Sequence, residues 1–387
     1  MKKLSAILSV VFVISVILAA CATPTPQAVV EKQVIQTQIV EKQVIQTQLV
    51  EKQVPVVQTQ IVQQTVVAPK SGKLIGYGAP ELSGGQGVIM NGMLTGIQQK
   101  GWAVVPTNAN FDASKQADQI DYFLSLGADA IVVVPQDSKA ICAAAKKAKD
   151  AGVYFFTIDR GVTGCKIDMT VQSDNYLAGK QSGEALVEML KKKYNGEAKG
   201  TVLELQGDLG QNVAQLRGGG FNDVLKQYPN VKVIQKPTEW KAEKFSQAVL
   251  DVVAAEPVDG IYMHSDCVGT VPVLAALDQL KKKVKADDPK HILLVGVDGC
   301  PDALKSIRDG FSDEASSQPL PDFGVVIADF IQTLFDGGQL KEGTITKEGA
   351  PWSPATVVKS DTGFIANLAT TKVLKDNAQD KGLWGNQ

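Results

Sequence analysis

Histidine is scarce in this chain of 387 residues, and neither sign of charge is in excess. The two histidines, His264 and His291, are not grouped with cysteines or carboxylates at the spacing of metal ligands. The sequence therefore predicts no metal site and no cofactor. The formal net charge of −2 and the pI of about 5.9 provide no field that would attract nucleic acid, so we expect no nucleic-acid partner.

The chain also lacks the motifs of common nucleotide-dependent enzymes. It has no phosphate-binding loop, and the glycines at 84–87 do not fit the spacing of a dinucleotide fingerprint between a strand and a helix. No nucleophile, base and acid form a recognisable set, because His264 stands alone. These absences favour a binding protein over an enzyme. An NAD-dependent oxidoreductase is the enzyme alternative, since strands and helices alternate along the chain.

Residues 1–20 have the features of an export signal. Lys2 and Lys3 give a positive start, and 6–19 form an apolar run too short for an ordinary membrane-spanning helix. The run ends at Leu18-Ala19-Ala20-Cys21, which resembles a bacterial lipobox, with small residues before the cleavage site and a thiol for a diacylglyceryl group. We predict a lipoprotein signal peptide and acyl chains such as palmitate on Cys21; a plain signal peptide is the alternative. The mature protein is then membrane-anchored on the extracytoplasmic face, at the cell surface or in the periplasm.

Residues 21–71 form a repeat rather than a domain. The sequence of 30–39 recurs at 40–49 and, loosened by Pro55, again from Val50. Its apolar residues recur about every five positions, which builds no continuous stripe on a helix and no single apolar face on a strand. We predict a stalk that follows the lipidated N-terminus; a helical, self-associating stalk is the alternative.

The cysteines beyond Cys21 are even in number, as is common in exported proteins with disulfides. They are Cys142, Cys165, Cys267 and Cys300. Cys142 and Cys165 lie near each other in the first half, and Cys267 and Cys300 each follow an apolar strand in the second. We predict the bridges Cys142–Cys165 and Cys267–Cys300; four buried free thiols are the alternative.

From residue 72 onward, apolar runs rich in β-branched residues alternate with helical patterns. Runs such as 130–134 and 292–297 are apolar on both faces, as in parallel strands covered by helices on both sides. The alternation restarts near residue 175, which indicates an α/β protein of two doubly wound parallel-sheet lobes with a hinge and an interlobe cleft. We expect an N-terminal lobe of 72–174 plus about 319–347, a C-terminal lobe of 175–318 plus about 348–387, and a monomeric body.

Polar residues follow the predicted strands, where open parallel sheets bind their ligands. They are Asn108, Asn110, Gln136, Asp137, Asp159, Arg160, Gln206, Asp208, Glu239, Trp240, Ser265, Asp266 and Asp298. Carboxylates accept hydrogen bonds from hydroxyls, arginine donates to them, and an indole covers the apolar face of a sugar ring. The predicted ligand is a small, neutral, polyhydroxylated molecule.

Short motifs of the body stand in a recognisable order. They are Lys115–Ile120 followed by Gly127–Ile131, Thr157–Arg160, Ser173–Asn175 with Gly179, Gly207 followed by Arg217 and Gly220-Phe221, and Gly296–Gly299 with Pro301-Asp302. In this order they resemble the type I periplasmic binding proteins, in the ribose/galactose-like sugar-binding branch of ABC transporter substrate-binding lipoproteins. The resemblance covers nearly all of 72–350 and implies the periplasmic-binding-protein-like two-lobe fold.

The resemblance also implies a ligand-binding set drawn from both lobes. Its members are Asp159, Arg160, Arg217, Trp240, Ser265, Asp298 and Gln318. Asp159 and Arg160 would hold ring hydroxyls from the first lobe, and Arg217 would reach in from the second. Simpler interpretations remain: a surface ion pair for Arg160, a solvated helix position for Arg217, a core or rim aromatic for Trp240 and a turn or cap residue for Asp298.

Two departures from the family pattern leave the ligand open. Many relatives carry phenylalanines just after the first strand, whereas Ala79–Gly87 contains no aromatic residue. Ser265 also stands where an asparagine is common. The resemblance therefore implies a sugar or sugar-like ligand without naming it, and a polyol, a nucleoside or a larger ligand remains an alternative.

The sequence thus predicts an extracytoplasmic solute-binding lipoprotein for carbohydrate transport. It would capture its ligand by hinge closure and deliver it to the membrane permease of an ABC importer. A ligand sensor or chemoreceptor adaptor with the same fold is the alternative function.

Overall fold

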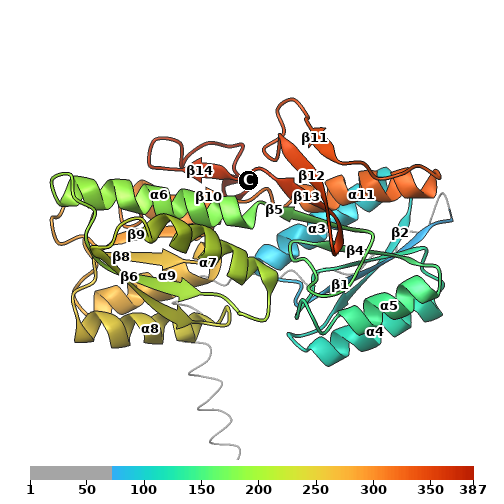
Figure 1. Cartoon of the computed structure of the whole chain (residues 1–387), viewed down its shortest axis with the longest axis horizontal. Coiled ribbons are helices and arrows are strands. Elements are labelled where there is room, and N and C mark those ends of the chain that lie inside the picture. Colours follow the sequence, from blue (N-terminus) through green and yellow to red (C-terminus); the bar gives the residue numbers. More distant parts are fainter. Residues whose placement is uncertain (1–71) are drawn as a thin grey trace, which may run out of the picture. The chain divides into compact units, whose positions relative to one another are not determined.

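The computed structural model describes residues 72–387, which form two α/β lobes (Figure 1). The predicted signal peptide, the lipidation site Cys21 and the stalk lie outside the described residues. Within 72–387, none of the helices combines the length and the apolar character needed to cross a membrane.

The first lobe is built on an eight-stranded sheet of order β11–β12–β13–β5–β4–β3–β1–β2. Its strands are β1 (Leu74–Ala79), β2 (Ala103–Asn108), β3 (Ala130–Val133), β4 (Tyr154–Ile158), β5 (Met169–Ser173), β11 (Gly343–Ile345), β12 (Ala355–Ser360) and β13 (Gly363–Leu368). Strands β1 to β5 and β13 pair in parallel, whereas β12 is antiparallel to both of its neighbours.

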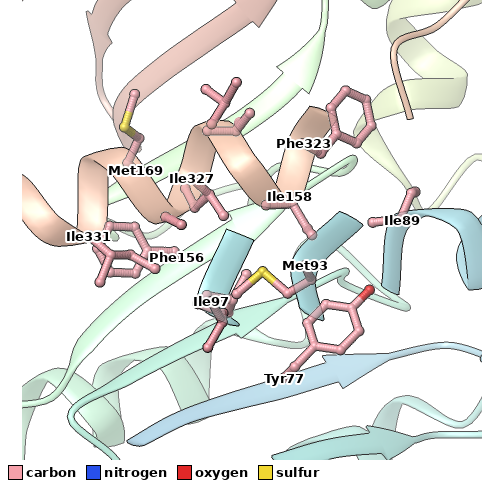
Figure 2. Close-up of a cluster of buried hydrophobic side chains, with 14 of the residues drawn as sticks. Tyr77, Ile89, Met93, Ile97, Phe156, Ile158, Met169, Phe323, Ile327 and Ile331 are labelled. Carbon is pink, nitrogen blue, oxygen red and sulfur yellow. The ribbon is translucent and has the colours of Figure 1, made fainter. Parts of the chain in front are cut away.

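Helices cover both faces of this sheet. On one face α3 (Gly84–Gln99) and α11 (Asp322–Phe335) enclose a cluster that includes Tyr77, Met93 and Phe156 (Figure 2). These two helices pack at their glycines: a Cβ on Gly92 would lie 2.1 Å from the Pro321 carbonyl oxygen. On the other face, α4 (Ala113–Ser125) and α5 (Cys142–Asp150) cover a second cluster.

The second lobe repeats this plan on a six-stranded sheet of order β14–β10–β9–β8–β6–β7. Its strands are β6 (Gly200–Gln206), β7 (Val231–Pro237), β8 (Gly260–Met263), β9 (Leu293–Asp298), β10 (Glu314–Ser317) and the antiparallel β14 (Thr371–Val373). Helices α6 (Asn175–Lys193) and α7 (Asn212–Leu225) cover one face, and α8 (Ala242–Ala255) and α9 (Asp266–Gln279) cover the other. Helix α10 (Pro301–Asp309) and the short η1 (Trp384–Asn386) pack beside β10 and β14. The predicted fold class is confirmed.

Within residues 72–387 the chain passes between the sheets three times, and the last passage differs from the prediction. It leaves the first sheet after β5, returns after β10, and crosses again only between β13 and β14. The expectation that about 348–387 completes the second lobe is therefore wrong for 355–368. These residues extend the first sheet because β13 pairs in parallel with β5, the last strand of the β1 to β5 set, from Phe364 to Leu368.

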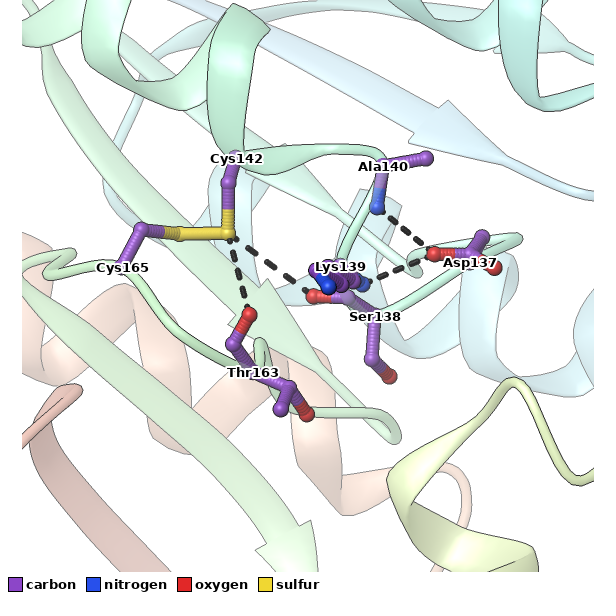
Figure 3. Close-up of a disulfide and its surroundings, with 7 residues drawn as sticks. All are labelled: Asp137, Ser138, Lys139, Ala140, Cys142, Thr163 and Cys165. Carbon is purple, nitrogen blue, oxygen red and sulfur yellow. Dashed lines mark hydrogen bonds between the residues drawn. A yellow bond between two sulfur atoms is a disulfide. The ribbon is translucent and has the colours of Figure 1, made fainter.

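Of the two predicted disulfides, one is present. Cys142, at the start of α5, is bonded to Cys165 with a Cα–Cα distance of 5.7 Å, and Asp137 accepts the backbone N–H groups of Lys139 and Ala140 just before that helix (Figure 3). The predicted Cys267–Cys300 bridge is wrong: both residues are free thiols. They do lie close together, but the Cys300 thiol is directed to Asp266, with its Sγ 3.5 Å from Asp266 Oδ1.

Candidate functional site

A cavity of about 610 Å³ lies between residues of the two lobes. First-lobe residues such as Gln86 and Gln136 line one wall, and residues at or just after the carboxyl ends of β6, β7, β8 and β9 line the other. Every residue of the predicted ligand-binding set lines this cavity: Asp159, Arg160, Arg217, Trp240, Ser265, Asp298 and Gln318. The fold thus brings together residues that are far apart in the sequence.

Asp159 and Arg160 form the first-lobe part of the site at the end of β4. The backbone of Asp159 is left-handed, with φ of 65°, and its carboxylate accepts a hydrogen bond of 3.0 Å from Gln86 Nε2. Arg160 lies 3.6 Å from this carboxylate through Nε and donates from Nη1 to the Pro135 carbonyl. Only 8% of Arg160 is exposed, and its burial lowers the pKa of the guanidinium. The surface-ion-pair interpretation is therefore wrong.

Arg217 and Asp298 form the centre of the second-lobe part. Arg217 projects from α7, is 4% exposed, and donates from Nη1 to Asp298 Oδ1 at 3.1 Å and from Nε to Asn175 Oδ1 at 2.9 Å. Asp298 also accepts from Ser265 and Gln318. Burial raises the pKa of Asp298, and the positive charge of Arg217 opposes this rise. The interpretation of Arg217 as a solvated helix residue is therefore wrong. So is the interpretation of Asp298 as only a turn or cap residue.

A buried pair behind Arg217 was missed by sequence reasoning. His264 Nε2 lies 2.9 Å from Glu204 Oε1, and its Nδ1 accepts the backbone N–H of Gly207 at 3.3 Å; neither side chain is exposed. Burial lowers the pKa of His264, so the ring is neutral and donates from Nε2. The His264 carbonyl in turn accepts from Arg217. The side-chain pair thus holds the His264 ring, and the backbone carbonyl of His264 helps to hold the arginine, although the sequence showed His264 only as isolated.

Two aromatic side chains line the cavity from opposite lobes. Trp240 donates from Nε1 to Gln211 Oε1 at 2.6 Å, and its ring lies against Gly207, where an added Cβ would fall 1.9 Å from the indole. Phe111, in the turn after β2, is 60% exposed and was also missed. The signal in the sequence that could have found Phe111 was its position beside Asn108 and Asn110, just after a predicted strand. The first lobe thus supplies an aromatic residue from this turn instead of from Ala79–Gly87.

Several polar atoms around the cavity are buried without a hydrogen-bond partner. They are Gln86 Oε1, Gln136 Oε1, Gln318 Oε1 and Arg160 Nε. An unpaired buried polar atom costs about 1–3 kcal/mol, so such atoms are rare unless something else satisfies them. Three acceptors and one donor on residues that line one cavity fit a ligand that carries several hydroxyl groups.

Hydrogen bonds also join the lobes beside the cavity. Asn212, at the start of α7, accepts the Gly161 N–H at 2.9 Å and donates to Gln172 Oε1 at 3.3 Å. Gln211 donates to the Gln136 carbonyl at 2.9 Å. Gln211 therefore links the first lobe directly to Trp240.

Comparison with known proteins agrees with this geometry. Residues 88–339 match the family model described as a periplasmic binding protein domain. The chain belongs to this family. As a periplasmic binding protein, it is 30% identical over 222 residues to the xylitol-binding protein of Mycolicibacterium smegmatis, a match that covers 57% of the chain and 60% of that relative. It is also 31% identical over 245 residues to the galactofuranose-binding protein of Escherichia coli, covering 60% of the chain and 74% of the relative.

Solved structures confirm the fold of this periplasmic binding protein. The crystal structure of a galactofuranose-binding protein superposes with a TM-score of 0.67 at 23% identity, covering 80% of the chain and 97% of the solved chain. Membership of the predicted periplasmic binding protein family is confirmed, and the relatives are named as binding proteins and not as enzymes. The match to the xylitol-binding protein spans less than two thirds of that relative's length.

Proposed function

We propose that the protein is an extracytoplasmic receptor that captures a sugar or a sugar-like polyol in the cavity between its lobes. The observation that carries this proposal is the set of unpaired polar atoms on Gln86, Gln136, Gln318 and Arg160. Hydroxyl groups donate to amide oxygens and accept from a guanidinium, so one polyhydroxylated ligand satisfies all four side chains. The names of the xylitol-binding and galactofuranose-binding relatives, a polyol and a sugar, support the same ligand class.

Both lobes contribute to binding in this proposal. Asp159 and Arg160 hold hydroxyls from the first lobe, and Arg217, Ser265, Asp298 and Gln318 hold them from the second. Trp240 and Phe111 cover apolar faces of the ligand, as aromatic rings do with the C–H surfaces of sugars. Because the cavity of about 610 Å³ exceeds the size of most monosaccharides, ordered water or a larger ligand fills the remainder.

Hinge closure couples binding to delivery. A ligand that touches both lobes binds the closed state better and shifts the population toward it. The hydrogen bonds of Asn212 and Gln211 to the first lobe belong to this closed state. The closed receptor then docks on the membrane permease of an ABC importer, while acyl chains on Cys21 hold it at the membrane and the stalk provides reach.

A thermal-shift screen of the purified chain against monosaccharides, polyols, nucleosides and nicotinamide dinucleotides tests the ligand class. A ligand at 100 times its dissociation constant adds about 2.7 kcal/mol to the free energy of unfolding, which raises the melting temperature by several degrees. A rise with a sugar or polyol supports the proposal. A rise only with a nicotinamide dinucleotide would overturn it.

Two matched variants then locate the site. Gln136→Leu removes an unpaired amide oxygen inside the cavity, and Gln119→Leu removes one that does not line it. We expect titration calorimetry to give about tenfold weaker binding for Gln136→Leu and unchanged binding for Gln119→Leu. Equal affinities in the two variants would place the ligand elsewhere.

The membrane anchor is tested separately by replacing Cys21 with alanine. We expect the unmodified chain in the membrane fraction of its host and the Cys21→Ala variant in the soluble exported fraction. Retention of the variant in the membrane would refute lipidation at this residue while leaving the ligand site untouched.

A further inference from the structure

A cluster of two thiols and one carboxylate lies beside the sugar cavity, in the wall of the second lobe. Asp266 and Cys267 begin α9, and Cys300 precedes α10 in the turn after β9. The Asp266 carboxylate and the two sulfur atoms lie within 4.8 Å of one another. The sequence pattern placed Cys267 and Cys300 together but did not show Asp266 beside them; β9 returns the chain so that Cys300 lies at the start of α9.

The carboxylate of Asp266 is fixed in place and lacks a positive partner. Only 2% of Asp266 is exposed, and it accepts the backbone N–H groups of Gly299 at 3.0 Å and Cys300 at 3.4 Å. Within residues 72–387, no lysine, arginine or histidine forms an ion pair with it. A buried carboxylate without a compensating charge is costly, and a bound cation removes that cost.

The distances suit a tetrahedral ion. With zinc–sulfur bonds of about 2.3 Å and a zinc–oxygen bond of about 2.0 Å, tetrahedral angles place the sulfur and the oxygen about 3.5 Å apart. Cys300 Sγ lies 3.5 Å from Asp266 Oδ1. The same geometry needs about 3.8 Å between the two sulfur atoms, and their separation of no more than 4.8 Å can be closed by side-chain rotation.

The cluster is accessible from one side. Cys267 is partly exposed and lines the cavity, whereas Cys300 is 6% exposed. An ion therefore enters past Cys267, and its fourth ligand, a water molecule or a hydroxyl, comes from the cavity side. Three protein ligands with one open position are the usual arrangement of an accessible zinc site.

We infer that Asp266, Cys267 and Cys300 bind a thiophilic divalent cation of the Zn²⁺ and Cd²⁺ class at the edge of the sugar cavity. Two thiolates select such ions over Mg²⁺ and Ca²⁺, which prefer oxygen ligands. This site does not depend on the identity of the sugar.

Cadmium titration of the full chain tests the inference, because cadmium thiolates have a charge-transfer absorbance in the ultraviolet. All proteins carry Cys21→Ser, so that Cys267 and Cys300 are the remaining free thiols. We expect the charge-transfer absorbance to saturate at one ion per chain. The double variant Cys267→Ser and Cys300→Ser should lose this absorbance, and Asp266→Asn should keep it but need more cadmium for half saturation.

Two results would overturn the inference. One is an absorbance in the double variant equal to that of the parent. The other is the absence of free thiols in the unfolded parent, which would mean that the cysteines are oxidised. Circular dichroism of each variant checks that it is folded, and Ser306→Ala, at a buried hydroxyl outside the cluster, serves as a matched control that should titrate like the parent.

Discussion

The two lobes share an architecture but differ in what they bury. In the described part of the first lobe, the buried charged side chains are Asp159 and Arg160, and both line the cavity. The second lobe buries many more acidic and basic side chains, the neutral His264 among them, in its interior as well as at the cavity: Glu204, Arg217, His264, Asp266, His291, Asp298 and Glu314. Beneath its ligand-binding edge, the first lobe is held by apolar clusters and one disulfide.

This difference separates two ways of fixing a binding residue. The first lobe fixes Asp159 and Arg160 at a strand end over an apolar core. The second fixes Arg217 through a polar network that includes Asn175, His264 and Asp298. Because an unpaired buried charge costs several kcal/mol, the second lobe should be the more sensitive to polar substitution and to pH.

The largest effect is expected from Arg217→Met, which leaves the Asp298 carboxylate buried without its ion pair. We expect the free energy of unfolding to fall by about 3–5 kcal/mol. The matched first-lobe change is Lys149→Met, which breaks a partly exposed pair with Asp168 and should cost about 1 kcal/mol or less. Urea unfolding of both variants measures the difference. Equal costs would remove the contrast between the lobes.

Removal of the first-lobe disulfide should come next. Replacing Cys142 and Cys165 by alanine releases a loop with a sequence separation of 23 residues and should lower the free energy of unfolding by about 3 kcal/mol. Hydrogen exchange should speed up in α5 and around Cys165, and not in α8 or α9 of the second lobe. Faster exchange throughout both lobes would show that the bridge supports more than its own lobe.

The second lobe should also make the free energy of unfolding depend on pH. Burial raises the pKa of Glu314 from 4.5 to about 7, so between these values the folded state binds more protons than the unfolded state. The Glu314 contribution to stability is therefore fully present below about pH 4.5 and decreases as the pH rises to about 7. Glu314→Gln should flatten this decrease and stabilise the protein by about 3 kcal/mol at pH 8. An unchanged pH profile of the unfolding free energy would contradict this assignment.

The smallest effect is expected on the affinity for the ligand and not on the free energy of unfolding. Gly207→Ala places a methyl group where the Trp240 ring lies and should displace the indole, weakening binding of the ligand found in the screen by about tenfold. Gly210→Ala, in the same loop, meets only carboxylate oxygens at 3.1–3.2 Å and should bind normally. Titration calorimetry compares the two. Equal affinities would mean that Trp240 does not contact the ligand.

The fold could be predicted from the sequence because its strands are apolar on both faces and its helices lie between them. The residues after those strands gave the candidate site, since parallel strands place their carboxyl ends at one edge of a sheet. This rule found Asp159, Arg160 and Asp298 directly. It did not find Gln86, which lies in α3 and reaches the cavity through the packing of that helix on the sheet.

Local patterns alone determined the alternation of elements, the restart of the sheet pattern near residue 175 and the polar strand ends. Only the tertiary structure decided which strands pair and which side chains are neighbours. It paired β13 with β5 in the first sheet and placed His264 against Glu204. It also directed Cys300 to Asp266 and not into a disulfide with Cys267. The physical reason is that periodicity records which face of an element is buried, whereas the neighbour on that face depends on long-range packing and on which charges need compensation.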